Sequence, residues 1–136
     1  MIPIHPVSRK LILCVDDDEA ILSYEKTLLE RSGYSVIAAA SAQQALGLVS
    51  MCEFDVVLLD YEMPDMNGCD LAFEIKRLRP ELAVISLSGS EVPTYVRVLV
   101  DAFILKLDAS RELIPRIAAL CSRHPKPLQR REGLQP

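Results

Sequence analysis

Short apolar runs alternate with helix-like segments five times along this chain of 136 residues. Each run is too short for a helix and rich in aliphatic side chains, which is typical of a buried strand. Such alternation with short connections indicates a parallel sheet covered on both faces. We therefore predict an α/β fold, a doubly wound five-stranded parallel sheet in the order 2-1-3-4-5 with helices on both faces. The expected strands are 11–15, 35–40, 55–59, 83–87 and 102–105, and the expected helices are 18–32, 42–51, 68–79, 91–100 and 108–122.

Residues with special backbone or capping preferences mark the expected helix ends. Asp17 or Asp18 can cap the first helix, and Gly33 is placed to end it. Pro93 allows at most a short fourth helix, because proline is tolerated only in a first turn. Pro115 falls inside the fifth helix, which predicts a kink or a late start there.

The composition is that of one globular domain, with 50% hydrophobic and 25% charged residues. A net charge of −4 argues against direct binding of nucleic acid or of an anionic membrane surface. No apolar run approaches the roughly 18 residues needed to cross a bilayer, and the first residues lack the layout of a secretion signal. The four cysteines are scattered and form no Cys-x-x-Cys pair, so a thiolate metal site is not expected. We expect a cytoplasmic protein.

The chain divides into three parts by composition. Residues 1–8 form an expected N-terminal extension, and residues 9–123 hold all the predicted strands and helices. Residues 124–136 are basic and contain three prolines, which predicts a flexible tail.

Polar side chains follow four of the five predicted strands at the point where each strand ends. Asp16 and Asp17 follow the first strand, Asp60 the third, Ser88 the fourth and Lys106 the fifth. The carboxyl ends of parallel strands meet at one edge, and sites in such sheets lie where the strand order reverses. We therefore expect these five side chains to lie close together.

Three carboxylates at one edge repel each other, by about 4 kcal/mol per pair at about 4 Å and an effective dielectric near 20. A cation removes this repulsion, and ligands that are all oxygen favour Mg²⁺ (or Mn²⁺). We expect Asp17 and Asp60 to bind the ion directly and Asp16 to act from a second layer or through water. The backbone carbonyl of Glu62 is a further expected ligand.

A carboxylate beside Mg²⁺ can attack a phosphoryl group and form an aspartyl phosphate. Asp60 is the expected phosphoacceptor. Lys106 would pair with one phosphoryl oxygen, and the Ser88 hydroxyl would bond to another. Gly89 leaves space for a phosphodonor to approach.

With the run Met63-Pro64-Asp65-Met66-Asn67-Gly68 after Asp60, these residues resemble the response-regulator receiver domain of two-component signalling over about residues 9–123. The resemblance implies a flavodoxin-like fold and a Mg²⁺-dependent phosphorelay switch, not a turnover enzyme. Asp60 would accept the phosphoryl group from a sensor histidine kinase or a phosphotransfer protein. Ser88 and Phe103 would then relay the change to the face of the fourth helix, fifth strand and fifth helix, where a downstream protein binds.

The sequence departs from that family in four respects. Leu107 follows the lysine where the family usually has proline, and Leu99-Val100 replace a usual Gly-Ala pair. The segment from Ser88 to Lys106 is also short, which predicts a shortened fourth helix. Glu62 adds an anionic side chain at the edge of the site, and we expect it to change the lifetime of the phosphoryl group.

Three alternatives have their own sequence signals. A receiver-like interaction module that is never phosphorylated would account for Leu107 and the short segment. A Mg²⁺-dependent phosphatase of the dehalogenase type resembles this site but carries Asp-x-Asp on its first strand, whereas here Asp60 and Glu62 follow the third. A flavin-binding relative would need a Ser/Thr/Gly loop after the first strand, where this chain has acids.

Overall fold

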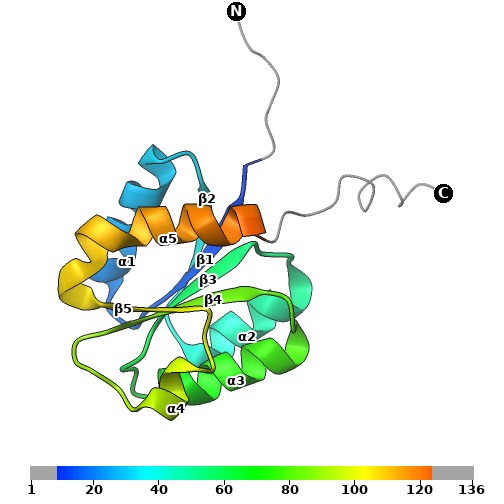
Figure 1. Ribbon diagram of the computed structural model, residues 1–136. Helices are drawn as coiled ribbons and strands as arrows, with labels where there is room; N and C mark the ends of the chain where they lie inside the picture. Colours follow the sequence, from blue (N-terminus) through cyan, green and yellow to red (C-terminus); the bar gives the residue numbers. More distant parts are fainter. Residues whose placement is uncertain (1–8, 124–136) are drawn as a thin grey trace, which may run out of the picture.

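The computed structural model describes residues 9–123. The expected N-terminal extension at 1–8 and the expected tail at 124–136 lie outside the described residues. One five-stranded sheet has the order β2-β1-β3-β4-β5, and every pair is parallel, as predicted (Figure 1). The strands are β1 Leu11–Val15, β2 Ser35–Ala39, β3 Val56–Asp60, β4 Ala83–Ser88 and β5 Ala102–Leu105.

Burial on both faces of the sheet explains why the strand sequences are mostly apolar. All five residues of β3 are buried, and so are all six of β4. Strands in parallel sheets have both faces covered, so their side chains are apolar on both sides instead of alternating with polar ones.

Helices cover the two faces of the sheet in pairs (Figure 1). The helices α1 Glu19–Arg31 and α5 Ala109–Arg123 pack on one face, where Ile12, Leu58 and Ile85 point. The helices α2 Ala42–Met51 and α3 Gly68–Leu78 pack on the other, where Leu13 and Leu59 point. Side chains alternate along each strand, so each strand contributes to both layers of core.

The first helix begins and ends at residues suited to those positions. Asp18, and not Asp17, caps α1, because its carboxylate accepts a hydrogen bond from the Ala20 backbone N–H at 2.9 Å. Gly33 adopts a φ of +99° just past the helix, and its N–H donates to the Glu30 carbonyl at 3.0 Å. This backbone conformation favours glycine and satisfies a carbonyl at the helix end. Asp17 is therefore not used as the cap.

The fourth helix has a single turn. α4 covers Thr94–Arg97, and its N-cap residue Pro93 makes no side-chain capping bond. The predicted shortening is confirmed. Proline can enter a helix only at its start, so the helix cannot extend back toward β4.

The last helix does not start late, so this part of the expectation for Pro115 is wrong. A 3₁₀ turn at Lys106–Asp108 leads directly into α5 at Ala109, well before the proline. Pro115 lies on the exposed side of α5, while Leu113 and Ile117 are buried. The carbonyl that loses its helical partner can therefore bond to water, and burial of the apolar side holds the helix together.

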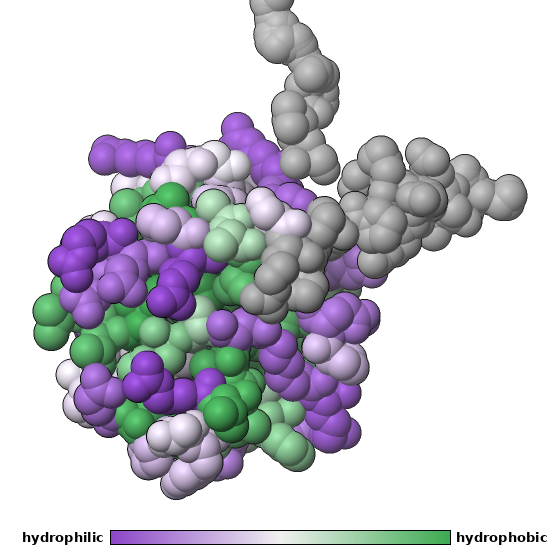
Figure 2. All heavy atoms as spheres, viewed as in Figure 1, coloured by the Kyte–Doolittle hydropathy of each residue, from purple (hydrophilic) through white to green (hydrophobic). Residues whose placement is uncertain are grey.

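At one edge of the sheet apolar surface lies between α5 and α4, with polar residues around it (Figure 2). The exposed large apolar residues of the segments at this edge are Tyr95, Val98 and Leu107.

Candidate functional site

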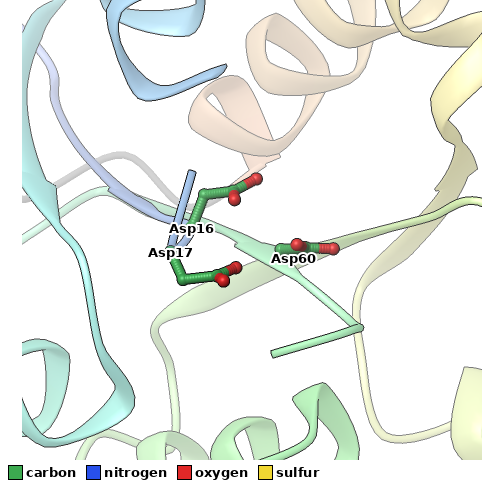
Figure 3. A group of neighbouring side chains, drawn as sticks. All are labelled: Asp16, Asp17 and Asp60. Atoms are coloured by element: carbon green, nitrogen blue, oxygen red, sulfur yellow. The ribbon is translucent and has the colours of Figure 1, made fainter. Parts of the chain in front are cut away.

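Three acidic side chains meet at the carboxyl ends of β1 and β3 (Figure 3). Asp16 and Asp17 follow β1, and Asp60 is the last residue of β3. One carboxylate oxygen from each of the three lies within 4.8 Å of the others. Asp16 and Asp60 are buried and Asp17 is exposed. The predicted clustering of the acids is therefore confirmed.

Backbone groups hold the two buried carboxylates in place. Asp16 Oδ1 accepts a hydrogen bond from the Asp18 N–H at 2.9 Å. Asp60 Oδ1 accepts one from the Glu62 N–H at 3.1 Å. In both cases the donor lies two residues further along the chain, an arrangement that fixes the carboxylate against its own turn.

The charged form of Asp16 is unfavourable in this cluster. Burial raises the pKa of Asp16 to about 6; the hydrogen bond from Asp18 opposes this rise, and the charge of Asp60 adds to it. A divalent cation would remove the repulsion. The donors are all carboxylate oxygens, as Mg²⁺ prefers, and all three lie within 4.8 Å of one another, close enough for one ion to be shared among them. The residues present therefore fit Mg²⁺.

Lys106 approaches the same site from β5. Its Nζ lies 3.0 Å from Asp60 Oδ1, and the Lys106 side chain is about one-third exposed. Partial burial lowers the pKa of Lys106, but the hydrogen bond to Asp60 and the charges of the nearby acids outweigh it, so the pKa is raised. Lys106 is thus a stable cation beside Asp60. It reaches this position although the next residue is Leu107, whose side chain is exposed.

Ser88 ends β4 with a fully buried side chain. Its hydroxyl oxygen lies 2.7 Å from the Ser90 carbonyl oxygen and 3.3 Å from Glu62 Oε2. The Ser90 N–H donates to the same hydroxyl at 3.2 Å. A serine has one hydrogen to donate, so the Ser90 carbonyl and Glu62 compete for it.

The side chain of Glu62, expected at the edge of the site, lies among its polar groups and makes contacts there that were not predicted. Its Oε1 accepts a hydrogen bond from the Gly89 N–H at 3.3 Å and lies 3.7 Å from Lys106 Nζ. Its place two residues after Asp60 was the only signal, and it does not fix the direction of the side chain because the chain bends at Tyr61, beyond the end of β3.

Phe103 does not reach the acidic cluster. It is a partly exposed residue of β5 whose partner on β4 is Ser86, two residues before Ser88. The Arg97 guanidinium carbon lies 4.7 Å from the centre of its ring, a cation–π contact between α4 and β5.

Glu25, a residue that was not predicted to matter, is a buried acid near the site. It lies on the buried side of α1 with Leu22 and Leu29, and it hydrogen-bonds to Cys14 of β1. Burial raises the pKa of Glu25 to about 8, and the negative charge of Asp16 adds to this. Its helical spacing with the two leucines was the signal, since it placed a carboxylate on the apolar face of the helix.

None of the helices within residues 9–123 combines the length and apolarity that a bilayer span requires.

Residues 12–118 match the response regulator receiver domain family. The chain is 33% identical over 119 residues to the response regulator SaeR of Staphylococcus aureus, covering 85% of this chain and 52% of SaeR. It is 31% identical over 136 residues to the sensor protein GacS of Pseudomonas syringae pv. syringae, covering 91% of this chain and 15% of GacS. The chain thus spans about half or less of the length of these curated relatives.

Solved structures agree with this match. A receiver domain protein from Methanospirillum hungatei superposes with a TM-score of 0.73 at 32% identity, covering 86% of this chain and 100% of that one. The response regulator TrrA of Thermotoga maritima, solved in complex with Mg²⁺–BeF, superposes with a TM-score of 0.77 at 28% identity, covering 82% of this chain and 98% of that one. With the family match covering most of its length, this chain belongs to the response regulator receiver domain family.

Proposed function

We propose that this protein is a phosphoacceptor switch of a two-component phosphorelay. Asp60 accepts a phosphoryl group from a sensor histidine kinase or a phosphotransfer protein in a reaction that requires Mg²⁺ or Mn²⁺. The observation that carries the proposal is the position of Asp60, which has a carboxylate oxygen within 4.8 Å of oxygens of Asp16 and Asp17 and has the Lys106 ammonium 3.0 Å from its Oδ1. Anionic ligands for a metal and a cation for the phosphoryl oxygens thus flank one buried nucleophile.

An Asp60 oxygen attacks phosphorus, and the bond between phosphorus and the donor atom breaks. Glu62 N–H and Lys106 hold the Asp60 carboxylate in place for this attack. Asp17 and Asp60, with the Glu62 backbone carbonyl, are the proposed direct metal ligands, and Asp16 acts from the second layer or through water. When bound, Mg²⁺ neutralises charge on the transferring group and orients it. The complex of TrrA with Mg²⁺–BeF supports this proposal by analogy.

Lys106 and Ser88 bind phosphoryl oxygens after transfer. The aspartyl phosphate carries about 1.5 to 2 negative charges in place of the single charge of the carboxylate, and its oxygens attract the ammonium and the hydroxyl. Movement of Ser88 and Phe103 then changes the surface formed by α4, β5 and α5, where a downstream protein binds. Exposed Tyr95, Val98 and Leu107 supply apolar contact area there.

We place this switch in the cytoplasm. The four cysteines of the chain are all unpaired, in keeping with a reducing compartment. The domain proposed to carry the function is 9–123.

Intact mass after incubation with Mg²⁺ and a small phosphodonor tests the proposal. The parent chain should gain one phosphoryl group, and Asp60→Asn should gain none. Asp70→Asn is the matched control, because Asp70 is an exposed acid in the first turn of α3. No gain by the parent, or a gain by Asp60→Asn equal to that of the parent, contradicts the proposal.

The single-turn α4 and Leu107 favour a second function, an interaction module that keeps the fold but is never phosphorylated. The same measurement separates the two functions, because such a module gains no phosphate even at high donor concentration. Turnover of the donor far beyond one equivalent would instead indicate a phosphatase.

A further inference from the structure

The Glu62 carboxylate contacts polar groups of the site near Asp60. Its Oε1 accepts from the Gly89 N–H at 3.3 Å, and its Oε2 lies 3.3 Å from the Ser88 hydroxyl, where it competes with the Ser90 carbonyl at 2.7 Å for the one hydroxyl hydrogen. Lys106 Nζ lies 3.7 Å from Oε1. A Cβ atom built at Gly89 would lie 3.7 and 3.9 Å from the two carboxylate oxygens, so the carboxylate fills the space in front of that glycine.

These contacts come from three separate segments. Ser88 and Gly89 stand at the end of β4, Lys106 begins the turn after β5, and Glu62 lies in the turn after β3. Two of the three contacted groups, the Ser88 hydroxyl and the Lys106 ammonium, are those assigned above to the phosphoryl oxygens. A carboxylate and a phosphoryl group are both anions that accept hydrogen bonds through several oxygens, so the same donors serve either.

We propose that Glu62 is an internal anion that occupies the phosphoryl-binding donors at rest and must leave them when Asp60 is phosphorylated. The inference rests on the proposed function. Glu62 can leave readily because its side chain is 48% exposed and can turn into water without burying a charge. Its backbone N–H can keep its bond to Asp60 meanwhile, since that bond does not involve the side chain.

Any phosphoryl analogue that binds beside Asp60 must first displace the Glu62 carboxylate from these donors. Because partly exposed ion pairs are weak, we expect about a three- to tenfold gain in affinity for beryllofluoride with Mg²⁺ when the carboxylate is removed. The loss of the Glu62 contact should also shift the NMR signal of the Gly89 N–H before any ligand is added.

Four variants of the full chain, labelled with nitrogen-15 and titrated with beryllofluoride at saturating Mg²⁺, test this. Glu62→Ala and Glu62→Gln remove the anion. Glu62→Asp keeps the charge but is one methylene shorter, so it separates occupation of the donors from a general effect of charge. Glu81→Gln is the control, because Glu81 is an exposed acid just before β4, at the opposite end of the sheet.

The proposal expects tighter binding for all three Glu62 variants, a shifted Gly89 signal in each without ligand, and no change for Glu81→Gln. Equal affinities of the parent and the Glu62 variants overturn it. Tighter binding by Glu62→Ala and Glu62→Gln with parental affinity for Glu62→Asp also overturns it, because charge alone then explains the effect. Phosphorylation of the parent with equal affinities refutes this inference alone, whereas no binding and no phosphate gain in any chain refutes the proposed function as well.

Discussion

Gly68 lies directly against the backbone of Tyr61. A Cβ atom at Gly68 would be 2.6 Å from Tyr61 Cα, and the Gly68 N–H donates to the Tyr61 carbonyl at 2.8 Å. The turn after Asp60 therefore folds back onto itself at the start of α3. This close approach requires a residue without a side chain and fixes the segment that carries Glu62.

Gly68→Ala should lower the free energy of unfolding by about 1–3 kcal/mol, because the methyl group meets backbone that cannot move aside easily. Urea unfolding measures this. Gly47→Ala is the matched control, since a Cβ at Gly47 meets nothing within 4 Å and the residue lies inside α2. That variant should gain about 0.5–1 kcal/mol. Similar stabilities of the two variants would contradict the assigned role of Gly68.

Glu25 should make the protein less stable as the pH rises. Its pKa is about 8 in the folded chain against an ordinary value of 4.5, so the folded state binds the proton more tightly than the unfolded state. Stability is therefore lost between about pH 4.5 and pH 8 and levels off above that range. Each unit of pKa difference corresponds to about 1.4 kcal/mol, which makes the loss on the order of a few kcal/mol.

Glu25→Gln should remove most of this pH dependence, measured as the difference between the free energies of unfolding at pH 5 and pH 8.5 in the presence of a chelator. Glu30→Gln, at an exposed position of the same helix, should keep the parental difference. An unchanged slope in Glu25→Gln would show that this carboxyl titrates normally.

Mg²⁺ should stabilise the protein through the acidic cluster. At about 100 times the dissociation constant, binding to the folded state alone adds about 2.7 kcal/mol, which appears as a rise in Tm. Asp17→Asn should lose most of this rise, while its exposed position leaves the metal-free Tm close to that of the parent. Glu19→Gln, an exposed acid in the first turn of α1, should respond to Mg²⁺ as the parent does. A full response in Asp17→Asn would exclude this aspartate as a ligand.

The side chain of Asp101, the residue just before β5, links Lys76 of α3 to the backbone of β4. Its Oδ2 lies 2.6 Å from Lys76 Nζ and accepts the Val84 N–H at 2.8 Å. Asp101→Asn should lower the free energy of unfolding by about 1–3 kcal/mol, because charge-assisted bonds at a largely buried carboxylate are strong. Glu30→Gln, which breaks the exposed pair with Lys26 at 2.9 Å, should cost no more than about 0.5 kcal/mol. Equal losses in urea unfolding would refute the assigned importance of Asp101.

The strand order and the positions of Asp16, Asp17, Asp60 and Lys106 could be predicted because they follow from short-range patterns. A parallel sheet brings its strand ends to one edge, whatever the details of packing. The contacts of Glu62 could not be predicted in the same way. They depend on the exact path of the turn after β3, which Gly68 fixes through its approach to Tyr61.

The bond between Lys76 and Asp101 could not be predicted from the sequence pattern either, because the two residues are 25 positions apart and neither lies at the carboxyl end of a strand. The late start expected for α5 was wrong for a different reason. Local backbone preference disfavours Pro115 within a helix, but the proline faces water while burial of the opposite side decides the structure.

Arg97 lies over the Phe103 ring and also pairs with Glu91 at 3.3 Å. If Phe103 turns on activation, the guanidinium loses the aromatic face that covers it. Because α4 is one turn long, such an event repositions a positive charge on the surface instead of rotating a long amphipathic helix. A downstream protein that distinguishes the two states would then need an acidic group to sense that charge, and its recognition should weaken as ionic strength rises.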